Sequence, residues 1–478
     1  MTLYQEYQQS RIAPPAIAKN DLVRMRIGQE LNQITEKRLT ILVAKNGTGK
    51  TTAVRHWDHY SPHKSAWFTA AQTDNDPAIF LELFIAALQT LHPQVGQDVF
   101  EQLRSENRPP IEEILKGMLG QLGMVLSQFA VIIDQYEQLR TTPVQNLITF
   151  FIANMPPQCH LVLISETEPT LPLAELRSAD QLLELRGPFL AFTMEEGQAL
   201  YNDVFKLQAA FGDITALVAG AKANAANLKY AGLALRDNPE AKSFIEKFEG
   251  ADDATYQVTL DVLLPRFSGD QQRFLLLTSV LEELHPELAA AVSGYDEAGE
   301  WLAQWAEAGT LVERTTGPGT WYRMHPFIRQ EFRLRLRDTM ARAEEKLNLL
   351  AAQWYRGEGF VEQAFRHLLA AEDLQGAADL VEAYAMGYLQ RGRMFTVEHW
   401  IASLPQLLTA GRAMLSVICA WIMIISGTAK GVPHHLENAR NALQKNPPEN
   451  HDEVLGYITA IEGYLAEKLG GETEGQHL

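Results

Sequence analysis

Apolar runs rich in β-branched residues alternate with helical patterns in the N-terminal part of the chain. Each run is short enough to be one buried strand, and residues 77–91, between two of the runs, carry apolar side chains at helical spacing. Strands that alternate with helices usually pair in parallel, so we expect a parallel sheet flanked by helices. The four runs are residues 39–43, 67–69, 129–134 and 160–165.

Helical patterns dominate after about Gly187, where the strand signals fade. Residues 194–238 and 257–284 have the spacing of helices, and the first of these segments is rich in alanine. Two short runs around a glycine-proline turn then predict a hairpin over residues 311–324. Helices followed by such a hairpin are typical of a winged helix.

From Arg335 onward the pattern predicts helices joined by short polar or glycine-containing turns. The longest expected helices are residues 341–356, 374–391, 407–426 and 453–469. This arrangement favours a solenoid of the tetratricopeptide kind, although no strict repeat signature recurs. Such arrays commonly bind proteins or ligands on a concave face, and a packed helical cap is the alternative.

The size and composition indicate a multidomain globular protein. With 478 residues the chain exceeds one hydrophobic core, because cores stop growing near roughly 250–300 residues. Hydrophobic residues at 46% and charged residues at 21% are the proportions of a folded chain and not of a disordered one.

The net charge, the two cysteines and the hydropathy of the chain bear on nucleic-acid binding, metal or disulfide sites and membrane insertion. A net charge of −18 argues against a chain that wraps nucleic acid non-specifically, since that binding uses lysine and arginine. Cys159 and Cys419 stand far apart without ligand-spaced companions, which gives no support to a disulfide framework or a zinc site and favours a cytoplasmic location. No signal peptide is expected, and the uncharged stretch 413–429 is shorter than the ~20 residues of a membrane span.

The run at 39–43 leads into a glycine-containing loop followed by a helical pattern, the arrangement of a phosphate-binding P-loop. Glycines let backbone amides surround phosphate oxygens, Lys50 would reach the terminal phosphates, and Thr51 would ligate Mg²⁺. Ala44 stands where the usual pattern has its first glycine. A glycine turn without a ligand is the alternative. The phosphate-binding candidates are Asn46, Gly47, Thr48, Gly49, Lys50, Thr51 and Thr52.

Acidic and polar residues at the ends of the next strands complete the expected site. Asp134 ends an apolar run and is the candidate magnesium ligand, with a strand-end turn carboxylate as the alternative. Gln135 follows where many P-loop ATPases have a second acid, and glutamine cannot accept a proton from water. We therefore expect slow hydrolysis at most, unless Glu137 substitutes. Ser165 is either a sensor of the γ-phosphate or a strand-end hydroxyl without a ligand.

These patterns predict a multidomain α/β plus α fold: a P-loop NTPase parallel sheet, a helical domain, a winged helix and a TPR-like helical array. The segments are an N-terminal arm (1–30), the P-loop nucleotide-binding domain (31–187), the helical domain (188–250), the winged-helix domain (251–340) and the TPR-like sensor or partner domain (341–478).

The order of the motifs resembles the STAND class of signal-transduction ATPases, specifically the MalT-type regulators, which usually end in a LuxR-type DNA-binding helix-turn-helix. The resemblance covers about residues 10–380. The motifs that carry it are residues 22–26, the P-loop, Trp67, 74–77, 131–136, 192–196, 277–281 and 321–327.

The resemblance implies a nucleotide, ATP or ADP with Mg²⁺, between the ATPase domain and the winged helix. His325 matches a histidine that touches the phosphates in the closed form, and a core histidine is the alternative. Arg24 or Arg26 would lie near the adenine and ribose. The resemblance also implies a cycle from an ADP-held closed monomer to an ATP-bound, inducer-dependent form that self-associates, with the inducer or protein partner on the helical array.

Three departures from the family pattern bear on these expectations. Glu166 stands after Ser165 where MalT-type chains tend to carry arginine, so a negative charge replaces a positive one. Ala223, Asn224 and Ala225 occupy the place of a glycine-proline type sensor motif. No basic helix-turn-helix precedes Leu478, so direct DNA binding does not follow from this sequence.

The sequence thus favours a nucleotide-dependent signalling switch, with weak ATPase activity as one outcome. A nucleotide-locked, non-hydrolysing interaction scaffold is the alternative, and Gln135 and Glu166 favour it. A transcription activator shortened at its C-terminus is a third hypothesis.

Overall fold

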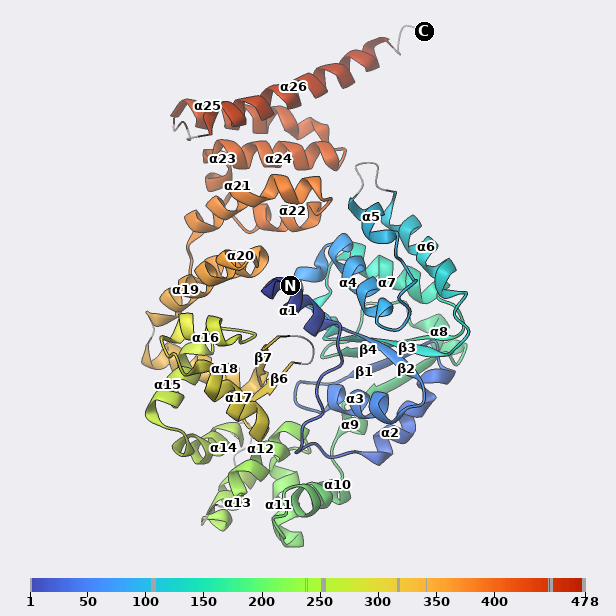
Figure 1. Ribbon diagram of the computed structural model, residues 1–478, viewed down its shortest axis with the longest axis vertical. Coiled ribbons are helices and arrows are strands. Elements are labelled where there is room, and N and C mark those ends of the chain that lie inside the picture. The colour runs from blue at the N-terminus through green and yellow to red at the C-terminus, as the bar shows by residue number, and fades with distance from the viewer. Residues whose placement is uncertain are drawn as a thin grey trace.

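The computed structural model describes the chain in its domains and in most of its connections (Figure 1). A domain built on a sheet lies beside a group of helices that carries a small hairpin, and further helices stack into a column above that group. Within the described part of the chain, no helix is long and apolar enough to cross a membrane. The described residues are 2–104, 109–236, 238, 240–250, 255–315, 319–340, 342–445, 447 and 450–474.

The N-terminal domain is built on a parallel sheet of five strands in the order β2-β3-β4-β1-β5. All four predicted strands are present, although the second begins at Lys64 rather than Trp67, because its first residues are polar and more exposed. The patterns did not predict the edge strand β5, in which only alternate residues are buried. The strands are β1 (Leu39–Val43), β2 (Lys64–Thr69), β3 (Phe129–Asp134), β4 (Cys159–Ser165) and β5 (Leu182–Arg186).

Both faces of the sheet are covered, because alternate strand residues point to opposite sides. Ile41 and Val131 join the core under α4, α6 and α7, whereas Leu42 and Ile132 join the core under α2 and α3. The order places β4 between the P-loop strand β1 and the Asp134 strand β3. The covering helices are α2 (Met25–Leu31), α3 (Lys50–Tyr60), α4 (Pro77–Gln89), α5 (Val99–Arg104), α6 (Ile111–Leu122) and α7 (Thr142–Asn154).

Helices and one hairpin make up the middle of the chain. The segment predicted as helical over 194–238 is broken, because residues 205–210 are irregular and Lys222 and Ala223 have positive φ. The predicted hairpin pairs β6 with β7, and residues 316–318 of its glycine-proline turn lie outside the described residues. The main elements are α10 (Met194–Gln198), α11 (Phe211–Gly220), α12 (Ala225–Leu235), α13 (Ala241–Glu249), α14 (Thr255–Leu263), α15 (Gly269–Thr278), α16 (Pro286–Ser293), α17 (Ala298–Ala308), β6 (Val312–Arg314), β7 (Tyr322–Met324) and α18 (Pro326–Thr339).

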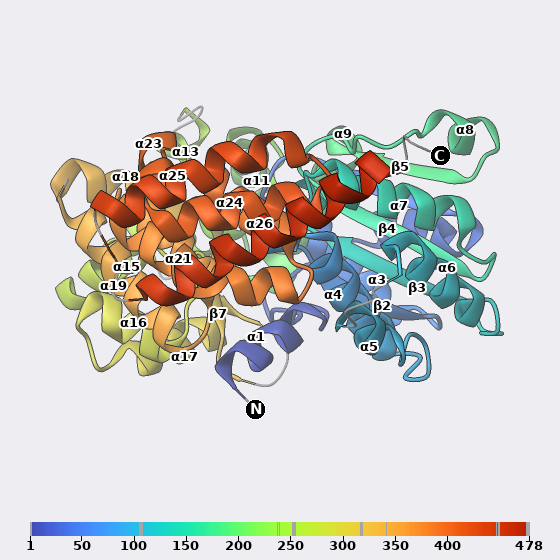
Figure 2. The same cartoon turned by 90° about the horizontal axis from the view of Figure 1, so that it is seen from above.

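The C-terminal helices form the column predicted as a TPR-like array (Figures 1 and 2). The expected single helix over 407–426 is wrong, because Arg412 has extended backbone and separates α23 from α24. Its side chain pairs instead with Asp379 and Glu382 of α21. The helices are α19 (Ala343–Gly357), α20 (Val361–Ala370), α21 (Leu374–Gln390), α22 (Met394–Ala402), α23 (Gln406–Gly411), α24 (Ala413–Ile425), α25 (Val432–Lys445) and α26 (His451–Glu474). The boundaries proposed for the five segments stay predictions.

The N-terminal helix α1 (Leu3–Arg11) joins three parts of the molecule (Figure 1). Arg11 is buried and donates hydrogen bonds to the carbonyl of Thr69 and to both carboxylate oxygens of Asp74, in the sheet domain. On the same helix, the ring of Tyr7 lies 5.1 Å from Trp321 in the winged helix and 5.6 Å from Phe360 in the array. Helix α1 therefore closes the space where the three parts meet.

The array also contacts the sheet domain directly. Arg393 Nη2 pairs with Glu82 Oε2 at 3.3 Å, and the backbone and hydroxyl of Thr396 donate to Asp76. Asp76 is the N-cap of α4, so this contact holds α22 against the start of a helix that covers the sheet.

Glu362 lies buried beside this contact and predicts a pH dependence. Burial raises its pKa to about 7, with Arg393 opposing and Asp74 and Asp76 reinforcing the shift. Because the unfolded pKa is ~4.3, the folded protein binds an extra proton between these values, so stability falls as pH rises from about 4.3 to about 7 and then levels off. We expect Glu362→Gln to remove this loss, which amounts to at most about 1.4 kcal/mol per pH unit.

The measurement is denaturant unfolding of wild type and Glu362→Gln at pH 5.5 and 8. The stability advantage of the variant over wild type should be larger at pH 8 than at pH 5.5, because wild type loses further stability between these pH values. Parallel pH profiles for the two proteins would contradict the assignment.

Candidate nucleotide site

The loop between β1 and α3 has the backbone of a phosphate-binding loop. Gly47 and Gly49 have φ of 77° and 83°, values that favour glycine, and Gly49 caps the N-terminus of α3. A Cβ at Gly47 would approach the side chain of Asn224 to 2.9 Å. Asn224 also donates to the carbonyl of Asn46, and the amide of Ala226 donates to the carbonyl of Gly47. The segment that departs from the family pattern therefore still contacts the loop.

Lys50 lies inside the loop and is 7% exposed. Its ammonium group donates to the carbonyl oxygens of Ala44 at 2.6 Å and Lys45 at 3.1 Å. Burial lowers the pKa of Lys50, and the carboxylates of Glu166 and Asp134 partly offset this effect. A buried ammonium group at the N-terminus of a helix is suited to bind phosphate.

Thr51 and Asp134 lie side by side, as a shared magnesium ion requires. The Thr51 hydroxyl donates to Asp134 Oδ1 and Oδ2, both at 3.1 Å. Burial raises the pKa of Asp134 to about 6, although the amide of Gln135 and the charge of Arg323 lower it. Gln135 itself has φ of 58°, an uncommon left-handed conformation for a residue other than glycine.

The hydroxyl of Ser165 is used in a local hydrogen bond within the turn after β4. This hydroxyl donates to the carbonyl of Thr167 at 2.7 Å, and the residue is 1% exposed. It lines neither of the two cavities at the phosphate loop, whereas its neighbour Glu166 lines the smaller one. This geometry favours the strand-end alternative for Ser165.

Arg24, at the N-cap of α2, and Arg26, in its first turn, link α2 to the start of the helical domain. Arg24 donates to the carbonyls of Leu190 and Ala191, and both arginines pair with Glu196, at 2.7 Å and 3.5 Å. Only Arg24 lines the large cavity. Both guanidinium groups therefore hold domains together, and Arg24 is the one within reach of a ligand.

His325 lies at the start of α18, in the wall opposite the P-loop. Its ring is 5.3 Å from that of Tyr230, and its Nδ1 atom is buried without a hydrogen-bond partner among the described residues. Burial lowers the pKa of His325 to about 4, so the ring is neutral at pH 7. A neutral ring next to phosphates can donate one hydrogen bond without adding charge.

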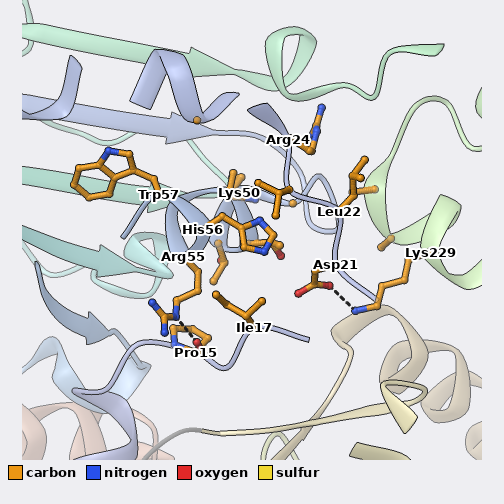
Figure 3. A pocket seen from close by; sticks show the side chains of 18 of the residues that line it. Pro15, Ile17, Asp21, Leu22, Arg24, Lys50, Arg55, His56, Trp57 and Lys229 are labelled. Carbon is orange, nitrogen blue, oxygen red and sulfur yellow. Dashed lines mark hydrogen bonds and ion pairs between the residues drawn. The ribbon is translucent and has the colours of Figure 1, made fainter. Parts of the chain in front are cut away.

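The large cavity has a volume of about 950 Å³ and is bounded by segments far apart in the sequence (Figure 3). Lys50 and the first turn of α3 form one side, and Ile17 and Leu22 from the segment before α2 form an apolar side. Across from them, Lys229 of α12 pairs with Asp21 at 3.0 Å. The volume lies within the range of known ligand pockets.

These features fit a nucleotide. The glycine backbone and Lys50 can hold phosphates, the apolar side of the cavity can hold a base, and the buried Nδ1 of His325 lacks a partner among the described residues. Sequence patterns did not single out Lys229 or Arg323, because their roles depend on contacts across domains. Arg323 does lie within the motif at 321–327.

The fold and this site agree with the resemblance to STAND-class P-loop ATPases. Residues 260–345 match the family described as the MalT winged helix domain. Over 478 aligned residues the chain is 25% identical to the HTH-type transcriptional regulator MalT of Yersinia enterocolitica, covering 98% of this chain and 52% of MalT. The chain is therefore related to MalT, and it spans about half of MalT's length.

The chain is also similar to a protein kinase and to one solved structure. The serine/threonine-protein kinase PknK of Mycobacterium tuberculosis is 26% identical over 415 residues, which cover 86% of this chain and 37% of the kinase. Among solved structures, a STAND protein with a tetratricopeptide repeat sensor from Pyrococcus horikoshii matches with a TM-score of 0.56. That match covers 95% of this chain and 68% of the other at 12% identity, and it supports the fold alone.

Proposed function

We propose that the chain is a nucleotide-controlled signalling switch in which ATP or ADP holds the P-loop domain and the winged helix together. The observation that carries the proposal is the shared cavity, which has Lys50 on one wall and Lys229 and His325 on the others. A ligand in such a cavity contacts several domains at once, so its identity can change how they pack. In this proposal, the phosphate ligands are the residues from Asn46 to Thr52, with Arg24 near the ribose.

Magnesium fits the pair formed by Thr51 and Asp134. When bound, the ion would supply positive charge to the phosphates. With a pKa of about 6, Asp134 is mainly ionised at pH 7, and the hydroxyl of Thr51 already lies against it. Acidification below pH 6 should therefore weaken magnesium binding, because the carboxyl must lose its proton to hold the ion.

Hydrolysis is slow in this proposal because the residue that follows Asp134 is Gln135 and not an acid. Gln135 can orient water but cannot accept a proton. Glu137, the possible substitute, accepts a hydrogen bond from the amide of Glu166 at 3.0 Å. This contact and Gln135 support the alternative of a nucleotide-locked scaffold.

In this proposal the switch responds to the nucleotide and also to a ligand or protein that binds the helical array. Among the described residues, the contact of the array with the sheet domain includes the ion pair of Arg393 with Glu82 and the hydrogen bonds from Thr396 to Asp76. An inducer or a protein partner that binds the array could weaken this contact and release surfaces for self-association. We also infer a cytoplasmic setting, in which Cys159 and Cys419 stay reduced.

The proposal is tested by denaturing the purified protein and identifying the released nucleotide by chromatography, followed by a steady-state turnover assay. One equivalent of ADP, with slow turnover that Lys50→Ala abolishes, supports the switch. Intact ATP without turnover supports the scaffold. Absence of nucleotide, together with no binding of added ATP or ADP, would refute both.

A further inference from the structure

A second cavity also adjoins the phosphate loop. Its volume is about 320 Å³, and it lies between the sheet domain, the winged helix and the first helices of the array. Lys50, Thr51, Asp134 and Arg323 line both this cavity and the large one. Arg323, on β7 of the winged helix, is thus the guanidinium group at the junction of the two cavities.

The other arginines around the small cavity have partners in protein contacts. Arg11 is engaged by Asp74 and Thr69. Arg366 of α20 pairs with Glu282 at 2.9 Å, and Arg329 lies 4.0 Å from the same glutamate. The contacts of Arg11 and Arg366 join different parts of the molecule, and that of Arg329 lies within the winged helix.

Arg323 differs because, of these four arginines, it alone lines both cavities. Its side chain is 31% exposed, and its one hydrogen bond within the described part of the chain runs from Nη2 to Glu283 Oε1 at 2.7 Å. A guanidinium group has five N–H donors, so several stay available. Its charge also reaches the magnesium site, since Arg323 lowers the pKa of Asp134.

The small cavity is otherwise acidic where it meets the phosphate loop. Glu137 and Glu166 line it next to Lys50, and their mutual repulsion adds to the effect of burial in raising the pKa of Glu166. An additional phosphate placed there would be repelled by both carboxylates. Arg323 is the nearby cation that can offset this repulsion from the opposite domain.

We propose that Arg323 distinguishes a nucleoside triphosphate from a diphosphate by binding the terminal phosphate in the small cavity, in exchange for Glu283. The inference rests on the proposed nucleotide site. It makes Arg323 a specificity-determining residue, because a diphosphate would end before the small cavity and leave the pair with Glu283 intact.

Movement of Arg323 from Glu283 to the phosphate would also make the packing of the array depend on which nucleotide is bound. Glu283 is 14% exposed and raises the pKa of Tyr7 in α1 and of Tyr355 in α19, so it lies among the elements that close the molecule. Once Arg323 turns away, this carboxylate stays buried without its cation, which is unfavourable. Its neighbour Glu282 holds Arg366 of α20. A triphosphate would thus loosen the contact between winged helix and array.

The test measures dissociation constants of Mg·ATP and Mg·ADP for the full chain by calorimetry, after nucleotide removal. Arg323→Ala should weaken ATP binding roughly 10- to 100-fold, the effect of one or two hydrogen bonds to a charged group, and change ADP binding less than about threefold. Arg337→Ala is the matched control, because Arg337 forms an arginine–glutamate pair with Glu344 on the outer side of the same domain. It should change neither constant.

Glu283→Gln separates a ligand role from a structural one. This variant releases Arg323 without removing it, so the preference for ATP over ADP should rise several-fold above that of wild type. Equal losses for both nucleotides in Arg323→Ala, or an unchanged ATP preference in Glu283→Gln, would overturn the inference. Failure of wild type to bind either nucleotide would instead refute the proposed nucleotide site. If Arg323→Ala does not fold, the Glu283→Gln result decides alone.

Discussion

Replacing Lys50 with alanine is expected to weaken binding of both Mg·ATP and Mg·ADP by at least about 100-fold. The ammonium group is buried at the N-terminus of α3, and each hydrogen bond from a charged donor contributes roughly 1.5–3 kcal/mol. Two such bonds to phosphate account for the expected loss, since about 1.4 kcal/mol corresponds to a factor of ten. Calorimetric titration measures both constants.

Lys45→Ala is the control for this experiment. Lys45 carries the same charge in the same loop, but its side chain is exposed and lines neither cavity. Binding should therefore change little, by a few-fold at most. Comparable losses in both variants would mean that general positive charge, and not the position of Lys50, governs binding.

The second large effect is expected on stability, from Arg11→Met. Asp74 is fully buried, and this change leaves its carboxylate without a cation. Removing one partner of a buried ion pair typically costs about 3–5 kcal/mol. Because Tyr7 on the same helix contacts the winged helix and the array, we expect loss of the docked α1 together with reduced resistance to denaturant.

Arg177→Met provides the comparison for Arg11. Arg177 makes two hydrogen bonds of 2.9 Å to Glu184, but it lies at the surface, where solvent screens the pair. Urea unfolding of the two variants should show a large shift of the midpoint for Arg11→Met and a small one for Arg177→Met. A small shift for both would contradict the role assigned to α1.

The sequence predicted most of the sheet because its strands are buried on both faces and therefore consist of continuous apolar runs. The edge strand β5 lacks such an apolar run, because it buries only Leu183 and Leu185, and the sequence patterns therefore did not predict it. The break between α23 and α24 was also missed, because the extended backbone of Arg412 accompanies its ion pairs with α21, and those depend on tertiary contact.

At the site, local motifs were more informative than contacts across domains. The P-loop follows strand β1 and Asp134 ends strand β3, so both could be predicted from the ends of apolar runs. The placement of Arg11 against Asp74, and of Arg323 at the junction of two cavities, joins residues far apart in the chain. No periodicity records such contacts, so only the assembled fold shows which cations face the phosphate loop.

The closed arrangement follows from where the charged pairs lie. Arg11, Arg323 and Arg393 each pair with an acidic residue of another helix or loop, and two of these pairs join different parts of the molecule across the sheet domain. The third pair, Arg323 with Glu283, lies within the winged helix beside both cavities. A nucleotide that competes for Arg323 would leave Glu283 without its cation next to α1 and α19. This is the physical basis of the proposed switch.

Hydrogen–deuterium exchange of the nucleotide-free chain, with and without Mg·ADP, tests the central claim most directly. The account predicts protection of the P-loop together with the start of α12 and the junction of β7 and α18, and no such protection in Lys50→Ala. Protection confined to the P-loop, with exchange unchanged at Asn224 and His325, would contradict a nucleotide held between domains.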